Sequence, residues 1–329
     1  MPYDSIQTSF LEEVKKRLPP NRSFVDELAE ILSISKDSAY RRIRGDTVLS
    51  LDEAKKLCDH SGVSIDSLFS PTSKAVPFMD MAAGGNITLE EWLNGILKNV
   101  SVISEMIYTA RDIPIWHYLR KPELAAFKMF FWQKTVMGNP SFQKLIFEPD
   151  IIPREMIHLG ERIWKKYSAV QSTEIWGAEA LHNTLKQIQF YEDCGFLKLR
   201  GQVPRLYDEL ADLLATIQSE ASDARKTDGN SFNLYYNEVL TMDNSVIART
   251  RDTQLTFLNY NTTGLLVTRH NGFCEKMRQY QTSLIKHSTL ISGTAEKERI
   301  KFFSRLTNLL DRRSDLDGAP ALRRMQHDG

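Results

Sequence analysis

Helix start and stop signals follow one another at short intervals through residues 1–70, and this spacing favours a compact bundle of short helices. Ile6, Phe10 and Val14 repeat every four positions, as on one face of a helix, and two prolines at 19 and 20 end it. Four more helices are expected to begin at serines whose side chains can cap free backbone amides: Ser23, Ser35, Ser50 and Ser64. Residues 1–69 are therefore predicted to form a domain of five helices.

Positive charge gathers in the third of these helices. From Ser35 to Gly45 the segment reads SKDSAYRRIRG, with four basic residues against one acidic, whereas residues 1–70 contain ten basic and twelve acidic residues. A local basic helix is typical of phosphate contacts, but a solvated helix face that binds nothing has the same composition. Charge alone leaves both interpretations open.

The order of the motifs favours the first interpretation, a basic helix that contacts phosphates. Residues 28–45, LAEILSISKDSAYRRIRG, followed by LSLDEAKKLCDHSGVSIDSLF at 49–69, resemble the helix-turn-helix family of lambda repressor and Cro. The shared features are Ala29 in the second helix, the spacing of the two helices, Gly45 closing the recognition helix and the trailing GVSIDSLF helix. The resemblance covers roughly one fifth of the chain. It implies a lambda-repressor-like domain whose third helix, Ser35–Arg44, enters the major groove of double-stranded DNA.

The same resemblance assigns the contacts. Side chains in the first turns of the recognition helix are expected to read base edges, namely Ser35, Lys36, Asp37, Ser38, Tyr40 and Arg41. Arg42 and Arg44 are expected on phosphates, and Thr47 beyond Gly45 on the DNA backbone. Four positions depart from the family pattern. Ser33 stands where the turn usually holds glycine, and Val25 about where the second helix often begins with a glutamine. Arg42 stands where an aliphatic side chain is more often buried, and Ile43 where the family is often acidic.

The remainder of the chain is predicted to be a linker, a larger domain and a tail. Residues 70–87 contain prolines and a Gly-Gly pair, which are typical of a linker. Residues 88–312 are expected to be helix-rich, with a small antiparallel β meander at 232–268 and a flexible tail at 313–329. The fold class is thus mainly α. Helices are predicted within this region at 89–107, 122–136, 153–170, 173–194, 203–221, 272–290 and 294–312.

The charge balance, the cysteine spacing and the lack of membrane or signal segments predict where the protein is found in the cell. The 329 residues carry forty-two basic and forty-two acidic side chains, so no global field draws the chain to nucleic acid or to a membrane. The three cysteines are widely spaced, which argues against disulfides. With no spanning apolar run and no signal peptide in the sequence, we expect a cytoplasmic protein without membrane contact.

Motifs for catalysis, metal binding or cofactor binding are missing from the sequence. The seven histidines are scattered, and neither a phosphate-binding loop nor a dinucleotide fingerprint occurs. We therefore expect no enzyme activity, no cofactor and no metal. Two aromatic clusters, Trp116-His117-Tyr118 and Glu174-Ile175-Trp176, fit either a ligand pocket or ordinary packing.

The leading hypothesis is a sequence-specific transcriptional regulator that binds double-stranded DNA as a homodimer through the carboxy-terminal region, and that responds to a small-molecule or protein effector. The alternatives are a protein-interaction or defence adaptor with a degenerate helix-turn-helix, and an unrecognised enzyme with a DNA-targeting head.

Overall fold

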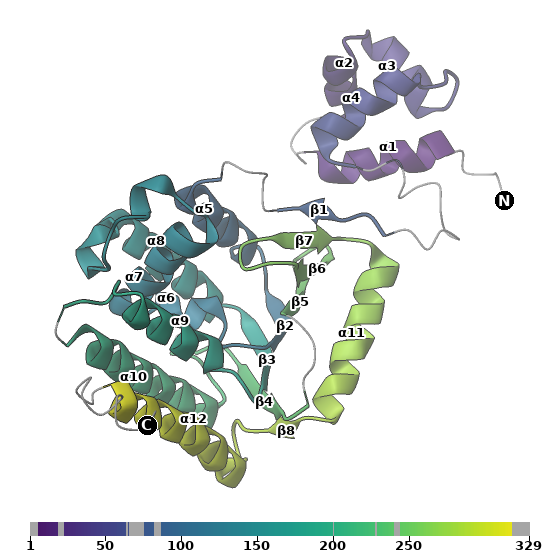
Figure 1. Cartoon of the computed structure of the whole chain (residues 1–329). Helices are drawn as coiled ribbons and strands as arrows, with labels where there is room; N and C mark the ends of the chain where they lie inside the picture. Colours follow the sequence, from purple (N-terminus) through teal and green to yellow (C-terminus); the bar gives the residue numbers. More distant parts are fainter. Residues whose placement is uncertain are drawn as a thin grey trace. The chain divides into compact units, whose positions relative to one another are not determined.

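The computed structural model describes residues 6–18, 23–63, 65, 76–81, 87–199, 201–227, 229–239 and 244–317. The chain divides into two compact units, residues 1–77 and 78–329 (Figure 1). Within the described residues, no helix is both long and apolar enough to cross a membrane.

Unit 1 is a cluster of short helices around its own apolar core. The helices are α1 (Ile6–Arg17), α2 (Phe24–Leu32), α3 (Lys36–Ile43) and α4 (Leu51–Ser61). Each gives one face to the core, whose buried members are Phe10, Leu11, Val14, Leu28, Leu32, Ala39, Ala54, Leu57 and Val63. Of the fifth predicted helix only Ile65 lies among the described residues, where it packs against this core.

Most of the predicted helix ends in unit 1 are confirmed. The hydroxyl oxygen of Ser35 accepts a hydrogen bond from the Ser38 amide, and Ser50 with Glu53 forms a complete capping box. Gly45 and Gly62 have φ of 81° and 67°, the left-handed conformation expected after a helix. Ser23 precedes α2 as predicted, but its side chain makes no capping hydrogen bond.

Unit 2 is built on one mixed sheet of eight strands. The strands are β1 (Met79–Asp80), β2 (Glu105–Ala110), β3 (Gln171–Gly177), β4 (Phe232–Asn237), β5 (Ser245–Arg249), β6 (Gln254–Asn259), β7 (Leu265–Thr268) and β8 (Thr289–Leu290). Their order is β1-β7-β6-β5-β2-β3-β4-β8. β2, β3 and β4 are parallel neighbours, and every other pair is antiparallel.

The prediction of a small antiparallel meander at 232–268 was wrong. β5, β6 and β7 do form a meander, but β4 lies across the sheet and pairs with β3 instead. β2 and β3 were predicted as parts of helices 89–107 and 173–194. Both are central strands covered on both faces, so they lack the alternation of polar and apolar residues that identifies a strand at a sheet surface.

Helices cover both faces of the sheet. Those of unit 2 are α5 (Leu89–Val100), α6 (Ile115–Leu119), α7 (Pro122–Phe131), the π-helix η2 (Trp132–Val136), the short 3-10 helices η3 (Pro140–Phe142) and η4 (Pro149–Ile151), α8 (Arg154–Ser168), α9 (His182–Asp193), α10 (Gln202–Asp223), α11 (Asn271–Lys286) and α12 (Glu296–Asp317). Figure 1 shows α11 alone on one face, against β5 and β6, and the other helices on the opposite face.

Two predicted boundaries need correction. The predicted linker 70–87 includes β1, which pairs with β7 and so belongs to the sheet; residues 70–75 and 82–86 lie outside the described residues. The predicted flexible tail at 313–329 begins inside α12, which continues to Asp317. The rest of the tail, 318–329, also lies outside the described residues.

The centre of unit 2 holds a fully buried polar cluster. Both carboxylate oxygens of Glu174 lie 3.2 Å from Nε2 of His117, and Nε1 of Trp176 donates to Glu174 at 2.7 Å. Burial raises the pKa of the Glu174 carboxyl, but His117, Tyr167 and Trp176 together bring it below its ordinary value. Because of these partners, Glu174 of β3 can be buried in the core.

Candidate nucleic-acid interface

α2 and α3 are joined by a tight turn in which Ser33 takes the critical conformation. Its φ and ψ are 56° and 47°, the left-handed region that favours glycine. This is the position where the sequence departs from the family pattern, and the chain accepts the strained conformation with serine. The turn places α3 across α2, as in a helix-turn-helix.

The inner face of α3 fixes the helix to the domain. Ala39 is fully buried against the other helices, and Ile43 packs one turn later on the same core. The small side chain of Ala39 allows the helices to approach closely. These contacts determine which residues of α3 face outward.

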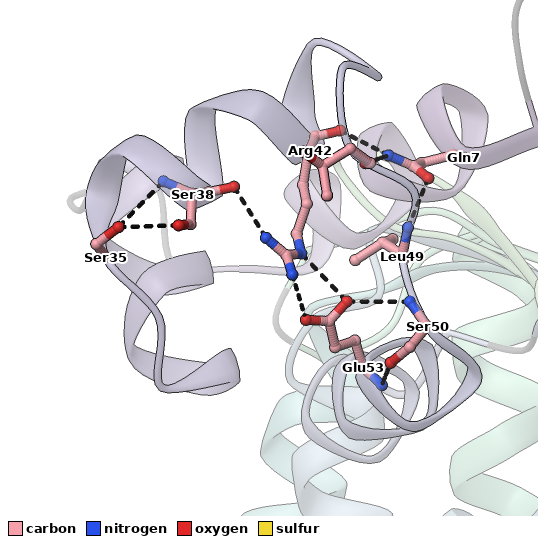
Figure 2. Close-up of polar contacts among 8 residues, drawn as sticks. Gln7, Ser35, Ser38, Arg42, Leu49, Ser50 and Glu53 are labelled. Carbon is pink, nitrogen blue, oxygen red and sulfur yellow. Dashed lines mark hydrogen bonds and ion pairs between the residues drawn. The ribbon is translucent and has the colours of Figure 1, made fainter.

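Arg42 also points inward, where its guanidinium forms a two-point ion pair with Glu53. Nε lies 3.1 Å from one carboxylate oxygen of Glu53, and Nη2 lies 2.7 Å from the other. Nη1 donates to the Ser38 carbonyl at 3.2 Å (Figure 2). The Arg42 hydrogen bonds and the Ser50 amide lower the pKa of the Glu53 carboxyl, although burial opposes them.

This pairing argues against the predicted contact between Arg42 and phosphate. The side chains of Arg42 and Glu53 are only 16% and 17% exposed, and both ends of the guanidinium fork are already engaged. Arg42 occupies the place of the family's buried aliphatic residue because Glu53 neutralises it. Its role in the structure is to connect α3 to α4.

Gln7 makes a second connection, from α1 to the end of α3 and the loop beyond it. Its amide nitrogen donates to the carbonyls of Arg42 and Thr47, each at 2.8 Å. Its amide oxygen accepts from the Leu49 amide at 2.9 Å (Figure 2). This role could not be predicted from the sequence, because the hydrogen-bond partners of Gln7 lie 35 to 42 residues away. Thr47, predicted as a DNA-backbone contact, is half-buried beside this bridge.

The outer face of α3 presents the other predicted contact residues to solvent. Ser35, Lys36, Asp37, Tyr40, Arg41 and Arg44 are exposed, and Ser38 is half-buried. Lys36, Tyr40 and Arg44 succeed one another at four-residue intervals, as neighbours along one stripe of a helix. Tyr40 has 52% of its surface exposed, although its ring is large and apolar. Of the nine predicted residues, six are thus exposed, Ser38 and Thr47 are half-buried, and Arg42 is engaged with Glu53.

Acidic neighbours neutralise part of the charge on this face. Lys36 lies 2.7 Å from Asp26 of α2, and Arg44 lies 2.9 Å from Asp46. Both pairs are solvent-exposed, and such pairs contribute roughly 0–1 kcal/mol, so an incoming phosphate can replace the carboxylates at small cost. Arg41 has no ion-pair partner among the described residues, which makes it the most accessible positive charge on α3.

Neither a metal site among the described residues nor a known relative indicates the function of this chain. Among the described residues, no group of three or more His, Cys, Asp or Glu side chains is placed to hold a metal ion. Comparison with known proteins found no matching family model, no matching curated protein and no matching solved structure. A proposal about function therefore rests on the geometry of α3 and on the sequence resemblance to the helix-turn-helix family.

Proposed function

We propose that this chain is a sequence-specific DNA-binding transcriptional regulator that inserts α3 into the major groove. The observation that carries the proposal is the division of α3 into two faces. Ala39, Arg42 and Ile43 hold the helix to its domain, and the predicted base-reading side chains are exposed, apart from the half-buried Ser38. A fixed helix with an exposed polar face is what direct readout of base edges requires.

Each exposed residue has a role that follows from its chemistry. Ser35, Lys36, Asp37 and Ser38, at the start of α3, offer short donors and acceptors to base edges. Tyr40 and Arg41 continue this surface by one turn, and Arg41 can donate two hydrogen bonds to one guanine. Arg44, at the end of the helix, suits a phosphate.

Dimerisation through unit 2 is part of the proposal. One α3 buries little surface on DNA, and two copies on half-sites one helical turn apart multiply the affinity. A dimer predicts a binding site with two-fold symmetry.

Selection of bound duplexes from a random DNA pool by the full-length protein tests the proposal. We expect an enriched motif with two-fold symmetry and affinity that falls steeply with salt. Arg41→Ala and Lys36→Ala should each weaken binding about tenfold or more. Lys55→Ala is the matched control, because Lys55 also forms an exposed ion pair, with Asp59, but on α4. Equal losses in all three variants, or a pool without a motif, would refute sequence reading by α3.

One observation favours a second function, a protein-interaction or defence adaptor. Residues 1–70 carry two more acidic than basic residues, and two of the cations on α3 are already paired. In that case the same variants would leave weak DNA binding unchanged, and loss of a protein complex on Tyr40→Ala would identify the outer face of α3 as a protein surface.

A further inference from the structure

A large cavity lies within unit 2, between the helices and one face of the sheet. It has a volume of about 860 Å³, is open to solvent on one side, and is lined by residues of α5, α6, α7, η2, α9 and strands β2, β5 and β6. Protein interiors are close-packed, and cavities of roughly 300–1,000 Å³ are typical of sites for small organic molecules. The cavity is therefore a candidate binding site, and it is independent of the DNA-binding proposal because it lies in unit 2 alone.

One end of the cavity is apolar and rich in aromatic side chains. The indole rings of Trp92 on α5 and Trp132 on η2 meet edge to face at 5.0 Å. Ile96 of α5, Phe257 of β6 and other apolar side chains continue this wall. The N–H of Trp92 is already bonded to the Thr263 carbonyl, so the wall offers ring surface more than hydrogen bonds. Such a surface favours a flat apolar group.

A buried lysine and a half-buried aspartate also line the cavity. Nζ of Lys128, on α7, donates to Oγ1 of Thr184 at 2.7 Å and to Oε1 of Gln187 at 2.8 Å, both on α9. Oδ1 of Asp112 accepts from the Ile113 amide at 2.9 Å and from the Tyr118 hydroxyl at 3.5 Å. Burial lowers the pKa of Lys128 to about 8 and raises that of Asp112 to about 6.

The charged side chains of the cavity lining are two lysines and one aspartate. Thr184 and Gln187 accept from two of the three N–H bonds of Lys128, and its Nζ lies 4.3 Å from the centroid of the Tyr118 ring, so the third N–H has no hydrogen-bond acceptor among the described residues. Lys186 stands exposed at the rim, with no ion pair among the described residues. The cavity lining thus carries two lysines against one aspartate, whose two hydrogen bonds are both accepted by Oδ1. This excess of one positive charge favours a ligand with a negatively charged group.

We propose that this cavity binds an amphipathic organic monoanion, with its apolar ring system between Trp92, Trp132 and the sheet and its carboxylate or equivalent group on Lys128 and Lys186. The aromatic cluster Trp116-His117-Tyr118, which fits a pocket or packing from sequence alone, serves both purposes. Trp116 and Tyr118 line the cavity, whereas His117 is buried on Glu174.

A matched pair of dyes tests the charge and the site together. 1-Anilinonaphthalene-8-sulfonate is an aromatic monoanion, and N-phenyl-1-naphthylamine is the same ring system without the sulfonate. Titrated into the full-length protein, the anion should bind with one-to-one stoichiometry and about tenfold more tightly than the neutral dye. Lys128→Met should remove that tenfold preference while the neutral dye keeps its affinity. Ile96→Phe, which fills the apolar end, should weaken both dyes.

The control is a lysine that is equally buried but faces elsewhere. Lys134 on η2 is 5% exposed, like Lys128, and donates to the carbonyls of Phe142 and Leu145 outside the cavity. Lys134→Met should leave the preference intact, and cooperative thermal unfolding shows whether each variant is folded. If Lys128→Met does not fold, the exposed variant Lys186→Met is decisive, with an expected loss of three- to tenfold for the anion alone. Equal affinity for the two dyes, or an equal effect of the cavity and control variants, would overturn the proposal.

Discussion

The ion pair between Arg42 and Glu53 should be the main polar support of α3, and a double-mutant cycle measures it. Breaking a fully buried pair costs about 3–5 kcal/mol and an exposed pair roughly 0–1 kcal/mol. With side chains about one-sixth exposed and two charge-assisted hydrogen bonds, the pair lies between these limits. We expect Arg42→Met to destabilise unit 1 by about 2 kcal/mol.

Glu53→Gln separates the ion pair from the capping box. Glutamine can still accept from the Ser50 amide, so the cap is retained while the charge is lost. We expect a cost of about 1 kcal/mol for this variant alone and about 2 kcal/mol for the double variant. The coupling energy is then about 1 kcal/mol. The exposed pair of Lys55 and Asp59, whose side chains are 73% and 65% exposed, is the control, and its two single variants are expected to be additive.

Hydrogen exchange of the α3 and α4 amides in the full-length protein is the appropriate assay. All five tryptophans lie between residues 92 and 176, so their fluorescence reports on unit 2 and not on unit 1. A loss of 2 kcal/mol corresponds to about thirtyfold faster exchange. Additive effects of Arg42→Met and Glu53→Gln, within about 0.3 kcal/mol, would show that the pair contributes nothing and that the account of Arg42 is incorrect.

Three further results are expected. Ser33→Gly should slow amide exchange in α2 and α3 by stabilising unit 1 by up to about 1 kcal/mol, because glycine adopts the left-handed conformation without steric cost, and unchanged or faster exchange would contradict this. Arg41→Met should lower the magnitude of the slope of log affinity for DNA against log salt by about 1, whereas Arg42→Met should leave this slope unchanged. If Arg42→Met lowered the slope and Arg41→Met did not, the phosphate contact would belong to Arg42. Burial lowers the pKa of Lys226 to about 8, below its value in the unfolded chain. Between about pH 8 and 10 the unfolded state therefore binds more protons than the folded state, and the stability of the wild type increases as the pH rises through this range. Relative to Lys226→Met, the unfolding free energy of the wild type in urea, followed by tryptophan fluorescence, should therefore rise by about 2 kcal/mol from pH 7 to pH 10; a constant difference would exclude this linkage.

Local signals in the sequence predicted local structure well. The cap predicted at Ser50 is present, because Ser50 and Glu53 are only three residues apart in the chain. Strands β5, β6 and β7 lie within the predicted segment 232–268 for the same reason, since turn residues separate them. The contact residues of the candidate interface were predicted from the family resemblance, and six of the nine are exposed.

The errors arose where a residue's environment is created by distant parts of the chain. The cluster around Glu174 was left open between a ligand pocket and ordinary packing, because its partner His117, which allows Glu174 to be buried, lies 57 positions away. β2 and β3 pair with each other at a separation of 66 residues, as in Glu105 with Gln171, so nothing nearby marks either as a strand. Arg42 reads as a free cation for the same reason, since Glu53 neutralises it from the next helix.

The order of the strands in the sheet determines when each strand can find its neighbours during synthesis of the chain. β2, at the centre of the sheet, pairs with β5 through contacts such as Glu105 with Arg249, and the edge strand β8 ends at Leu290. At about 5–20 residues per second, roughly 10–40 s separate the synthesis of β2 from that of β8. Unit 1 precedes unit 2 in the chain, and its contacts are more local, so it can fold during that interval. On a ribosome, unit 1 would thus be complete while the apolar strand β2 still lacks its neighbours, and this interval is when the nascent chain most needs a chaperone.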